Sequence, residues 1–132
     1  MHVKVVGAGS IGNHLSHAAR SLDWRVDLVD TDPQALERTR TQIYPGRYGE
    51  WDSEITLYTA DEAPSGGYDF IFIGTPPDSH IPLALAAVDE RPRAVLVEKP
   101  LCPPDMEGVD DLTERARTRD VAVFVGYDHV VG

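Results

Sequence analysis

The sequence has little cysteine, little lysine and no long apolar run. Only one of its 132 residues is a cysteine, Cys102, so no disulfide can form within the chain and the fold must rest on a hydrophobic core. No run of 18 apolar residues is present, which argues against a transmembrane helix. Lys4 and the glycines from Gly7 onward interrupt any signal-peptide segment. We therefore expect one domain and a cytoplasmic location.

Basic residues are scarce, and lysines most of all. The net charge is −10, which argues against nucleic acid or an anionic membrane as a partner. Either a GC-rich genome or a salt-adapted host could explain the acidic excess. Lys4 and Lys99 are the two lysines, so Lys99 is the only one beyond the first predicted strand.

Short β-branched runs alternate with helical patterns along the chain, which is typical of βαβ units. The sequence predicts an α/β fold with a doubly wound, mostly parallel six-stranded sheet of the Rossmann type, with strand order 3-2-1-4-5-6. The predicted strands are residues 2–6, 25–29, 54–58, 69–73, 94–97 and 121–125.

Apolar spacing and capping residues predict the helices between the strands. The first helix is expected to bury a face made of Ile11, Leu15, Ala18 and Leu22. Asp32 as N-cap and Pro33 at the first helical position open the second helix. Residues 45–52 are rich in turn-forming residues and are predicted to be a surface loop. We interpret the aromatic residues around it as a shield for the sheet edge, with contact to a partner as the alternative.

A glycine-rich loop follows the first predicted strand. Gly7, Gly9 and Gly12 match the pattern GxGxxG, with Ser10 and Ile11 before the last glycine. Its position between a strand and a helix is the context that a dinucleotide-binding loop requires. The first glycine permits a tight turn, the second lets the backbone approach a pyrophosphate, and the third lets the helix pack closely. The alternative is a bare turn in a fold that has lost its ligand.

Asp30 ends the second predicted strand, 18 residues after Gly12. A carboxylate there accepts hydrogen bonds from ribose hydroxyls and repels a 2′-phosphate. No basic residue follows until Arg38, so the sequence favours NAD over NADP. His14 and His17 lie one helical turn apart with no third ligand nearby, and we interpret them as solvated surface residues, with no metal site.

Two unusual segments follow the fourth and fifth predicted strands, where an open parallel sheet binds its ligands. Thr75 and Pro76 form a stiff turn that could wall a cofactor, and His80 could contact a site or a neighbouring loop. In the second segment, Lys99 could polarise a hydroxyl or carbonyl group or transfer a proton, with Glu98 orienting it. The alternative for Lys99 is an exposed charge on a loop.

These motifs together resemble a known family. The set GAGSIG, Asp30, GTPPDSH and EKPL, followed by VGYDH, is similar to the N-terminal domain of the Gfo/Idh/MocA oxidoreductases from Val3 to about His129. The resemblance implies NAD(P)-dependent oxidation or reduction of a sugar, cyclitol or related hydroxyl compound. It implies a catalytic Lys99 beside the nicotinamide. Cofactor-site residues implied by it are Thr75, Pro76, His80 and Glu98.

The chain departs from the family pattern at three places. Leu15 stands where the family often has a histidine, and the sequence after Gly126-Tyr127 differs from the usual stretch. Family enzymes also use a second sheet domain for the substrate, which we expect to be absent from residues 1–132. We therefore expect cofactor binding with little or no turnover by the chain alone, and homo-oligomers are possible. The alternative function is a non-catalytic NAD(H)-sensing module, although such modules lack the EKP and Thr-Pro segments.

Overall fold

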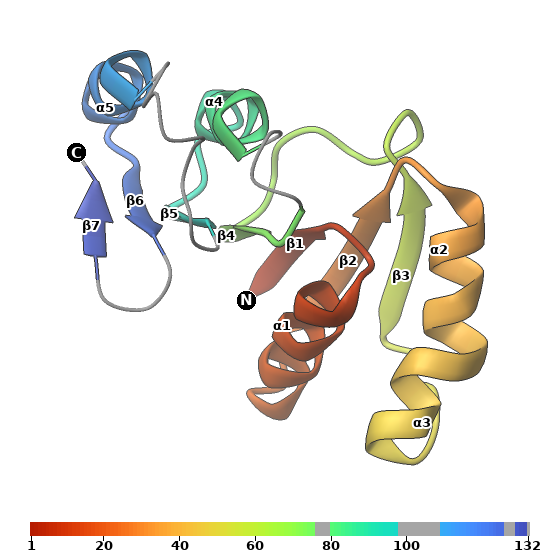
Figure 1. Cartoon of the computed structure of the whole chain (residues 1–132). Helices are drawn as coiled ribbons and strands as arrows, with labels where there is room; N and C mark the ends of the chain where they lie inside the picture. Colours follow the sequence, from red (N-terminus) through yellow and green to blue (C-terminus); the bar gives the residue numbers. More distant parts are fainter. Residues whose placement is uncertain (76–79, 98–108, 126–128, 132) are drawn as a thin grey trace.

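The structure, a computed structural model, describes residues 1–75, 80–97, 109–125 and 129–131. A sheet of seven strands runs through the molecule in the order β3-β2-β1-β4-β5-β6-β7 (Figure 1). The strands are β1 (His2–Val6), β2 (Arg25–Asp30), β3 (Ile55–Thr59), β4 (Phe70–Ile73), β5 (Ala94–Val97), β6 (Ala122–Val125) and β7 (His129–Val131). The first six are parallel, which confirms the predicted Rossmann order.

The seventh strand was not predicted. β7 pairs antiparallel with β6, and Val130 lies opposite Phe124 in the register. Three residues are too few to show the alternation by which a strand is recognised in a sequence. The sheet is therefore mixed at one edge.

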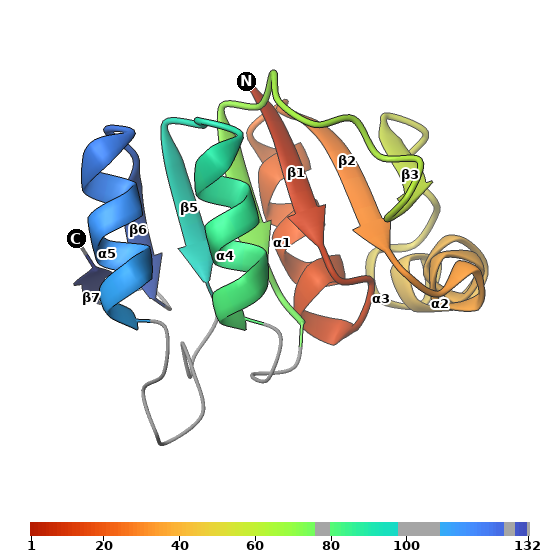
Figure 2. The same ribbon diagram turned by 90° about the horizontal axis from the view of Figure 1, so that it is seen from above.

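Helices cover both faces of the sheet (Figure 2). One face carries α1 (Ser10–Ser21), α2 (Pro33–Arg38), the π-helical segment η1 (Thr39–Ile43) and α3 (Tyr44–Tyr48). The other face carries α4 (His80–Asp89) and α5 (Val109–Thr118). The chain crosses from one face of the sheet to the other between β3 and β4. The connections that follow the neighbouring strands β1 and β4 therefore run to opposite faces of the sheet. This switch point is where doubly wound sheets bind their ligands. None of the described helices is long and apolar enough to cross a membrane.

Two apolar clusters, one on each face, form the core. β4 and β5 are continuous apolar runs, in which fully buried residues alternate with half-buried ones. The α1–α3 face buries Val3, Val5, Val26, Leu28 and Ile55 from the strands. The α4–α5 face buries Ile71, Ile73, Val95, Val97 and Val123. The two layers hold the carboxyl ends of the strands in fixed positions.

The predicted inner face of the first helix was right at Leu15 and wrong at its other three residues. Ile11 is 41% exposed and Leu22 is 60% exposed, and Ala18 is also on the outside. The helix instead buries Gly12, Asn13, Leu15, Ser16 and Ala19. Small and polar residues can face the sheet here because the helix lies close to it. Asn13 Nδ2 donates to the Gly9 carbonyl at 2.8 Å and the Ala8 carbonyl at 3.2 Å, while its Oδ1 has no partner among the described residues.

The predicted loop over residues 45–52 was also wrong in its first half. The helical run that Asp32 caps, by accepting from the Gln34 N–H at 2.9 Å, continues through η1 and α3 to Tyr48. Pro45 lies in the first turn of α3, directly after the π-helical segment, where proline is tolerated. The run ends at Gly49, which has a φ of +97°.

The aromatic residues of this segment pack together on α1. Tyr44 is buried at 3% exposure and meets Trp51 edge to face at 5.4 Å between ring centroids. Tyr48 stacks on His17 at 3.7 Å. The interpretation of His17 as a solvated residue was therefore wrong, while His14 is exposed. Within the described part of the chain, no group of three or more His, Cys, Asp or Glu side chains is arranged to hold a metal ion.

Polar side chains toward the amino ends of the strands are paired with one another. Lys4, only 7% exposed, places Nζ at 3.0 and 2.9 Å from the two carboxylate oxygens of Glu90. Glu90 also accepts from the Gly66 N–H at 2.7 Å. The Tyr68 hydroxyl donates to the Asp27 carboxylate at 2.7 Å. Burial, and then this hydrogen bond, raise the pKa of Tyr68 well above its ordinary value.

Candidate functional site

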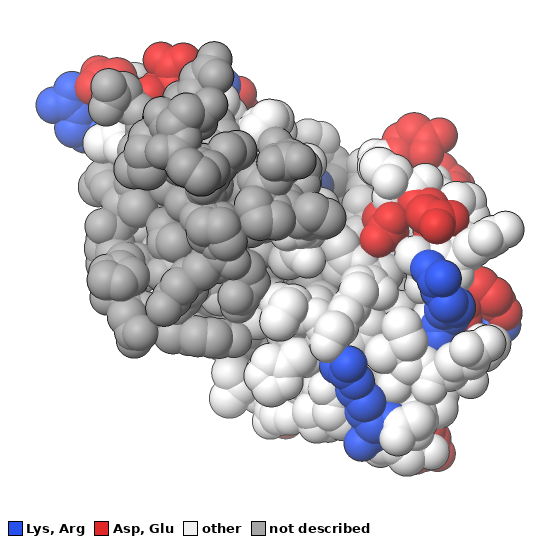
Figure 3. All heavy atoms as spheres, in the orientation of Figure 1, with Lys and Arg blue, Asp and Glu red and all other residues white. Residues whose placement is uncertain are grey.

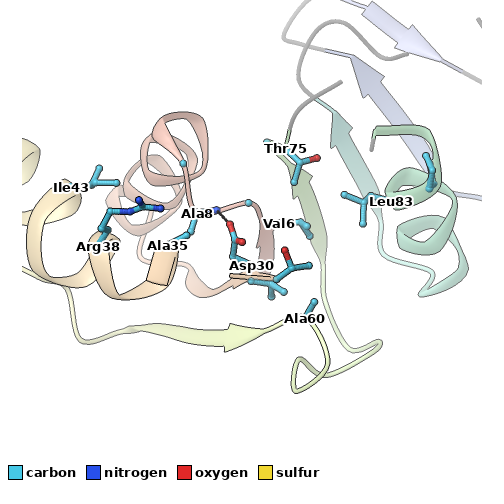
Figure 4. Close-up of a pocket in the computed structure, with 15 residues that line it drawn as sticks. Val6, Ala8, Asp30, Ala35, Arg38, Ile43, Ala60, Thr75 and Leu83 are labelled. Atoms are coloured by element: carbon cyan, nitrogen blue, oxygen red, sulfur yellow. Dashed lines mark hydrogen bonds between the residues drawn. The ribbon is translucent and has the colours of Figure 1, made fainter. Parts of the chain in front are cut away.

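A cavity of about 760 Å³ opens at the carboxyl ends of the strands. Its walls come from the loop after β1, the end of β2, the helix α2 and the segment after β4 (Figure 4). The lining residues include Gly7, Ala8, Gly9, Asp30, Ala35, Arg38, Ile43, Ala60, Thr75 and Leu83. Most are apolar, with a carboxylate and a guanidinium among them, as expected of a small-molecule site.

Two of the three motif glycines are required by the fold itself. Gly7 has φ +106°, a conformation that other residues rarely adopt. A Cβ at Gly12 would lie 1.7 Å from the Gly7 carbonyl oxygen, so any side chain there would force α1 away from the loop. Both glycines keep the turn between β1 and α1 tight.

Gly9 is different, because nothing in the fold needs it to be a glycine. No heavy atom lies within 4 Å of a Cβ built there, and its φ is −87°. Gly9 is the N-cap of α1 and lines the cavity, and it offers no side chain to the free N–H groups of the first turn. Those donors and the positive end of the helix dipole suit a phosphate group that approaches the bare backbone.

The Asp30 carboxylate is fixed beside this loop. Oδ2 accepts from the Ala8 N–H at 2.8 Å, and Oδ1 accepts from the Asp32 N–H at 2.9 Å. Each oxygen keeps a further lone pair, because a carboxylate offers about four acceptor positions. Asp30 can therefore hold the loop and accept from ligand hydroxyls at the same time.

Arg38 reaches the same cavity from α2. Figure 4 shows its side chain pointing toward the loop that carries Ala8. Among the described residues its guanidinium has no hydrogen-bond or ion-pair partner. The sequence placed Arg38 eight residues after Asp30, but the first turns of α2 bring it back over the strand end. Sequence distance therefore gave a poor estimate of its distance from the cavity.

The structure brings together some of the predicted site residues. Gly7, Gly9, Asp30 and Thr75 all line the cavity, and a Cβ on Gly7 would lie 3.0 Å from Thr75 Cγ2. Ser10, Ile11 and Gly12 form the first turn of α1 beside the cavity and do not line it.

The remaining predicted residues follow β4 and β5 in the sequence. His80 begins α4, and its side chain is not among those described. Pro76, Glu98 and Lys99 lie outside the described residues. The catalytic role of Lys99 therefore stays a prediction.

Several residues of the site were missed by reading the sequence. Ala35 and Ile43, from the helical run that follows β2, line the cavity. Leu83 of α4 adds an apolar wall from the other side of the switch point. Arg47, within the predicted loop, contacts Ser10. No local signal could have found that contact, because it joins segments 37 residues apart.

The parallel sheet order, the glycine turn from β1 into α1 and the acidic residue at the end of β2 define a dinucleotide-binding Rossmann domain. The family model described as "Oxidoreductase family, NAD-binding Rossmann fold" matches residues 1–127. The chain belongs to the Gfo/Idh/MocA oxidoreductase family, as its motifs predicted. No curated protein matches the sequence.

Solved structures of dehydrogenases share this fold. The WlbA dehydrogenase from Bordetella pertussis, in complex with NADH and UDP-GlcNAcA, is 23% identical with a TM-score of 0.69, over 94% of this chain and 36% of that one. A probable dehydrogenase from Thermotoga maritima is 20% identical with a TM-score of 0.71, over 96% and 36%. Apo scyllo-inositol dehydrogenase from Lactobacillus casei is 18% identical with a TM-score of 0.68, over 96% and 36%. The chain thus spans about a third of their length.

Proposed function

We propose that this chain is the NAD(P)-binding part of an oxidoreductase that transfers a hydride to or from a sugar, cyclitol or related hydroxyl compound. The observation that carries the proposal is the Asp30 carboxylate, held in the cavity next to the bare backbone of Gly9. The loop would hold the pyrophosphate and Asp30 the adenosine ribose. The cofactor supplies the hydride chemistry when bound.

NAD is the favoured cofactor because hydrogen bonds hold the Asp30 carboxylate in place. Its two oxygens are tied to the backbone N–H groups of Ala8 and Asp32, so its negative charge stays beside the ribose position. A 2′-phosphate there would be repelled. Arg38 is the one cation lining the cavity among the described residues, and it would offset only part of that repulsion.

The catalytic step would use residues that follow β4 and β5. From the sequence, we propose that Lys99 assists proton transfer at the substrate, that Glu98 supports it, and that Pro76 and His80 help wall the cofactor. These 132 residues alone would bind cofactor with little or no turnover, since the related dehydrogenases are nearly three times as long. Two of these are described with a sugar nucleotide or as an inositol dehydrogenase, which supports the proposed substrate class. A cytoplasmic location and possible homo-oligomers complete the proposal.

Titration with NADH and NADPH, followed by nucleotide fluorescence, tests the proposal. We expect the wild type to bind NADH more tightly than NADPH. In Asp30→Ala, NADH affinity should fall about tenfold, as expected when a charged hydrogen-bond acceptor is lost, and the preference over NADPH should shrink or reverse.

The matched control is Asp32→Ala, which removes a carboxylate that caps α2 and does not line the cavity. It should leave the preference between the two nucleotides unchanged. If neither nucleotide binds the wild type at millimolar concentration, the proposed function is wrong.

A further inference from the structure

A basic side chain from outside the glycine motif forms two hydrogen bonds with the first residue of α1. Arg47 Nη1 donates to the Ser10 carbonyl oxygen at 3.0 Å, and Nη2 donates to Ser10 Oγ at 2.7 Å. Both residues are exposed. The guanidinium therefore lies at solvent, directly beside the loop to which we assign the pyrophosphate.

Arg47 is presented by a rigid element. Its helix, α3, is anchored on either side of it: the Tyr44 ring is buried in the core and Tyr48 stacks on His17 of α1. A charged side chain placed by a packed helix needs little reorganisation when a ligand arrives. The contact with Ser10 is therefore present before the cofactor binds.

The contact also determines what the Ser10 hydroxyl can do. A serine hydroxyl has one proton and two lone pairs. One lone pair accepts from Arg47 Nη2, which leaves the proton free for a further acceptor. An anion at the start of α1 would supply that acceptor.

The negative charge around the loop disfavours an anionic ligand unless a cation lies nearby. The chain carries a net charge of −10, and exposed Asp32, Asp61 and Glu62 lie close to the strand ends. Figure 3 shows that basic side chains are few over the α1–α3 half of this face, while acidic ones gather near the top of it. This negative potential would repel a pyrophosphate, so nearby guanidinium groups contribute more to its binding.

Resting on the proposed function, we propose that Arg47 is a positioning residue for the pyrophosphate of the cofactor. It holds Ser10 so that the hydroxyl proton can be donated to a phosphate oxygen, and it places a positive charge beside the diphosphate. The phosphate site is thus built from two segments, the glycine loop and α3, and not from the loop alone.

The test compares ligands with and without phosphate. In Arg47→Met, the affinities for NADH and ADP-ribose should fall about three- to tenfold, as expected for the net loss of one hydrogen bond. The affinity for adenosine, measured by NMR chemical-shift titration, should change less than twofold. Arg40→Met is the matched control, because Arg40 is exposed and pairs with Glu37 in the same helical run. It should leave all three affinities near the wild-type values.

Two further variants keep the proposal testable if Arg47→Met fails to fold. Arg47→Lys keeps the charge without the two-pronged contact, and should recover part of the loss. Ser10→Ala removes the hydroxyl and should lower ADP-ribose affinity while sparing adenosine. Equal losses for adenosine and ADP-ribose, or no loss in any variant, would overturn the role of Arg47. Failure of the wild type to bind NADH would instead overturn the proposed function.

Discussion

The polar groups at the two ends of the sheet differ: those at the amino ends are paired with one another, and those at the carboxyl ends face a cavity. Toward the amino ends, Lys4 is paired with Glu90, and Tyr68 with Asp27, in largely buried positions. At the carboxyl ends, Asp30 is exposed in part to a cavity of about 760 Å³. The first arrangement leaves few hydrogen-bonding positions for a ligand, whereas the second leaves many. Stability and binding should therefore respond to different substitutions.

The largest expected effect is on stability and lies at the amino ends. Lys4→Met leaves the Glu90 carboxylate, with 13% of its side chain exposed, without its cation. Breaking such a pair on one side costs about 3 kcal/mol, since a nearly buried charge is left unpaired. Urea unfolding measures the loss, and NADH affinity of the folded protein should not change.

Arg93→Met is the control for that experiment. It removes a positive charge at the same end of the sheet, but Arg93 is 70% exposed and lies 3.6 Å from Asp69. The free energy of unfolding should change by less than about 0.5 kcal/mol. If Lys4→Met has an equally small effect, the view of the amino ends as a stabilising network is wrong.

The next effect is on binding and lies at the carboxyl ends. Gly9→Ala adds a methyl group where the fold leaves open space, so the midpoint of thermal unfolding should hardly move. NADH affinity should fall tenfold or more, because the methyl group would occupy the approach of the pyrophosphate to the backbone. Gly12→Ala is the counterpart: its Cβ would meet the Gly7 carbonyl oxygen, and it should lower stability as well as binding. Unchanged NADH affinity in Gly9→Ala would contradict the placement of the pyrophosphate.

The smallest effect concerns Tyr68. Tyr68→Phe removes the hydroxyl that donates to the buried Asp27 carboxylate, which should cost about 1 kcal/mol at neutral pH. The pKa of Tyr68 is higher in the folded than in the unfolded state. The contribution of the hydroxyl to stability is therefore complete below the unfolded pKa of about 10 and declines as the pH rises above it. The difference in unfolding free energy between wild type and variant should narrow above pH 10, and a difference that widens would contradict this sign.

Local patterns were enough to predict the first six strands and the glycine turn. Apolar runs closed by Gly7, Asp30 and Gly74 mark strand ends, and the order of the first six strands follows from the rules for parallel connections. Asp32 and Pro33 also gave the start of α2 correctly. Each of these signals lies within a few residues of the feature it predicts.

Other features depend on contacts between distant segments, and the sequence did not reveal them. Ile11 was expected inside and is exposed, while Asn13 was not considered and is fully buried. Asn13 is accommodated because its amide nitrogen donates to Thr39 and to the glycine loop. In the site, Asp30 was found from its spacing, but the inward reach of Arg38 and the contact of Arg47 depend on how α2 and α3 lie against α1.

The central place of β1 bears on how the chain acquires its structure during synthesis. β1 emerges first, yet it lies between β2 and β4, and Lys4 meets its carboxylate 86 residues later. A nascent chain can pair β1 with β2 while one edge of β1 stays unpaired and the Lys4 ammonium has no counter-ion. Contacts so distant in sequence form slowly because the intervening loop must first be ordered. The arrival of β4 and Glu90 is therefore the event that joins the two halves of the domain, and until then the first half carries an open strand edge that a second chain could occupy.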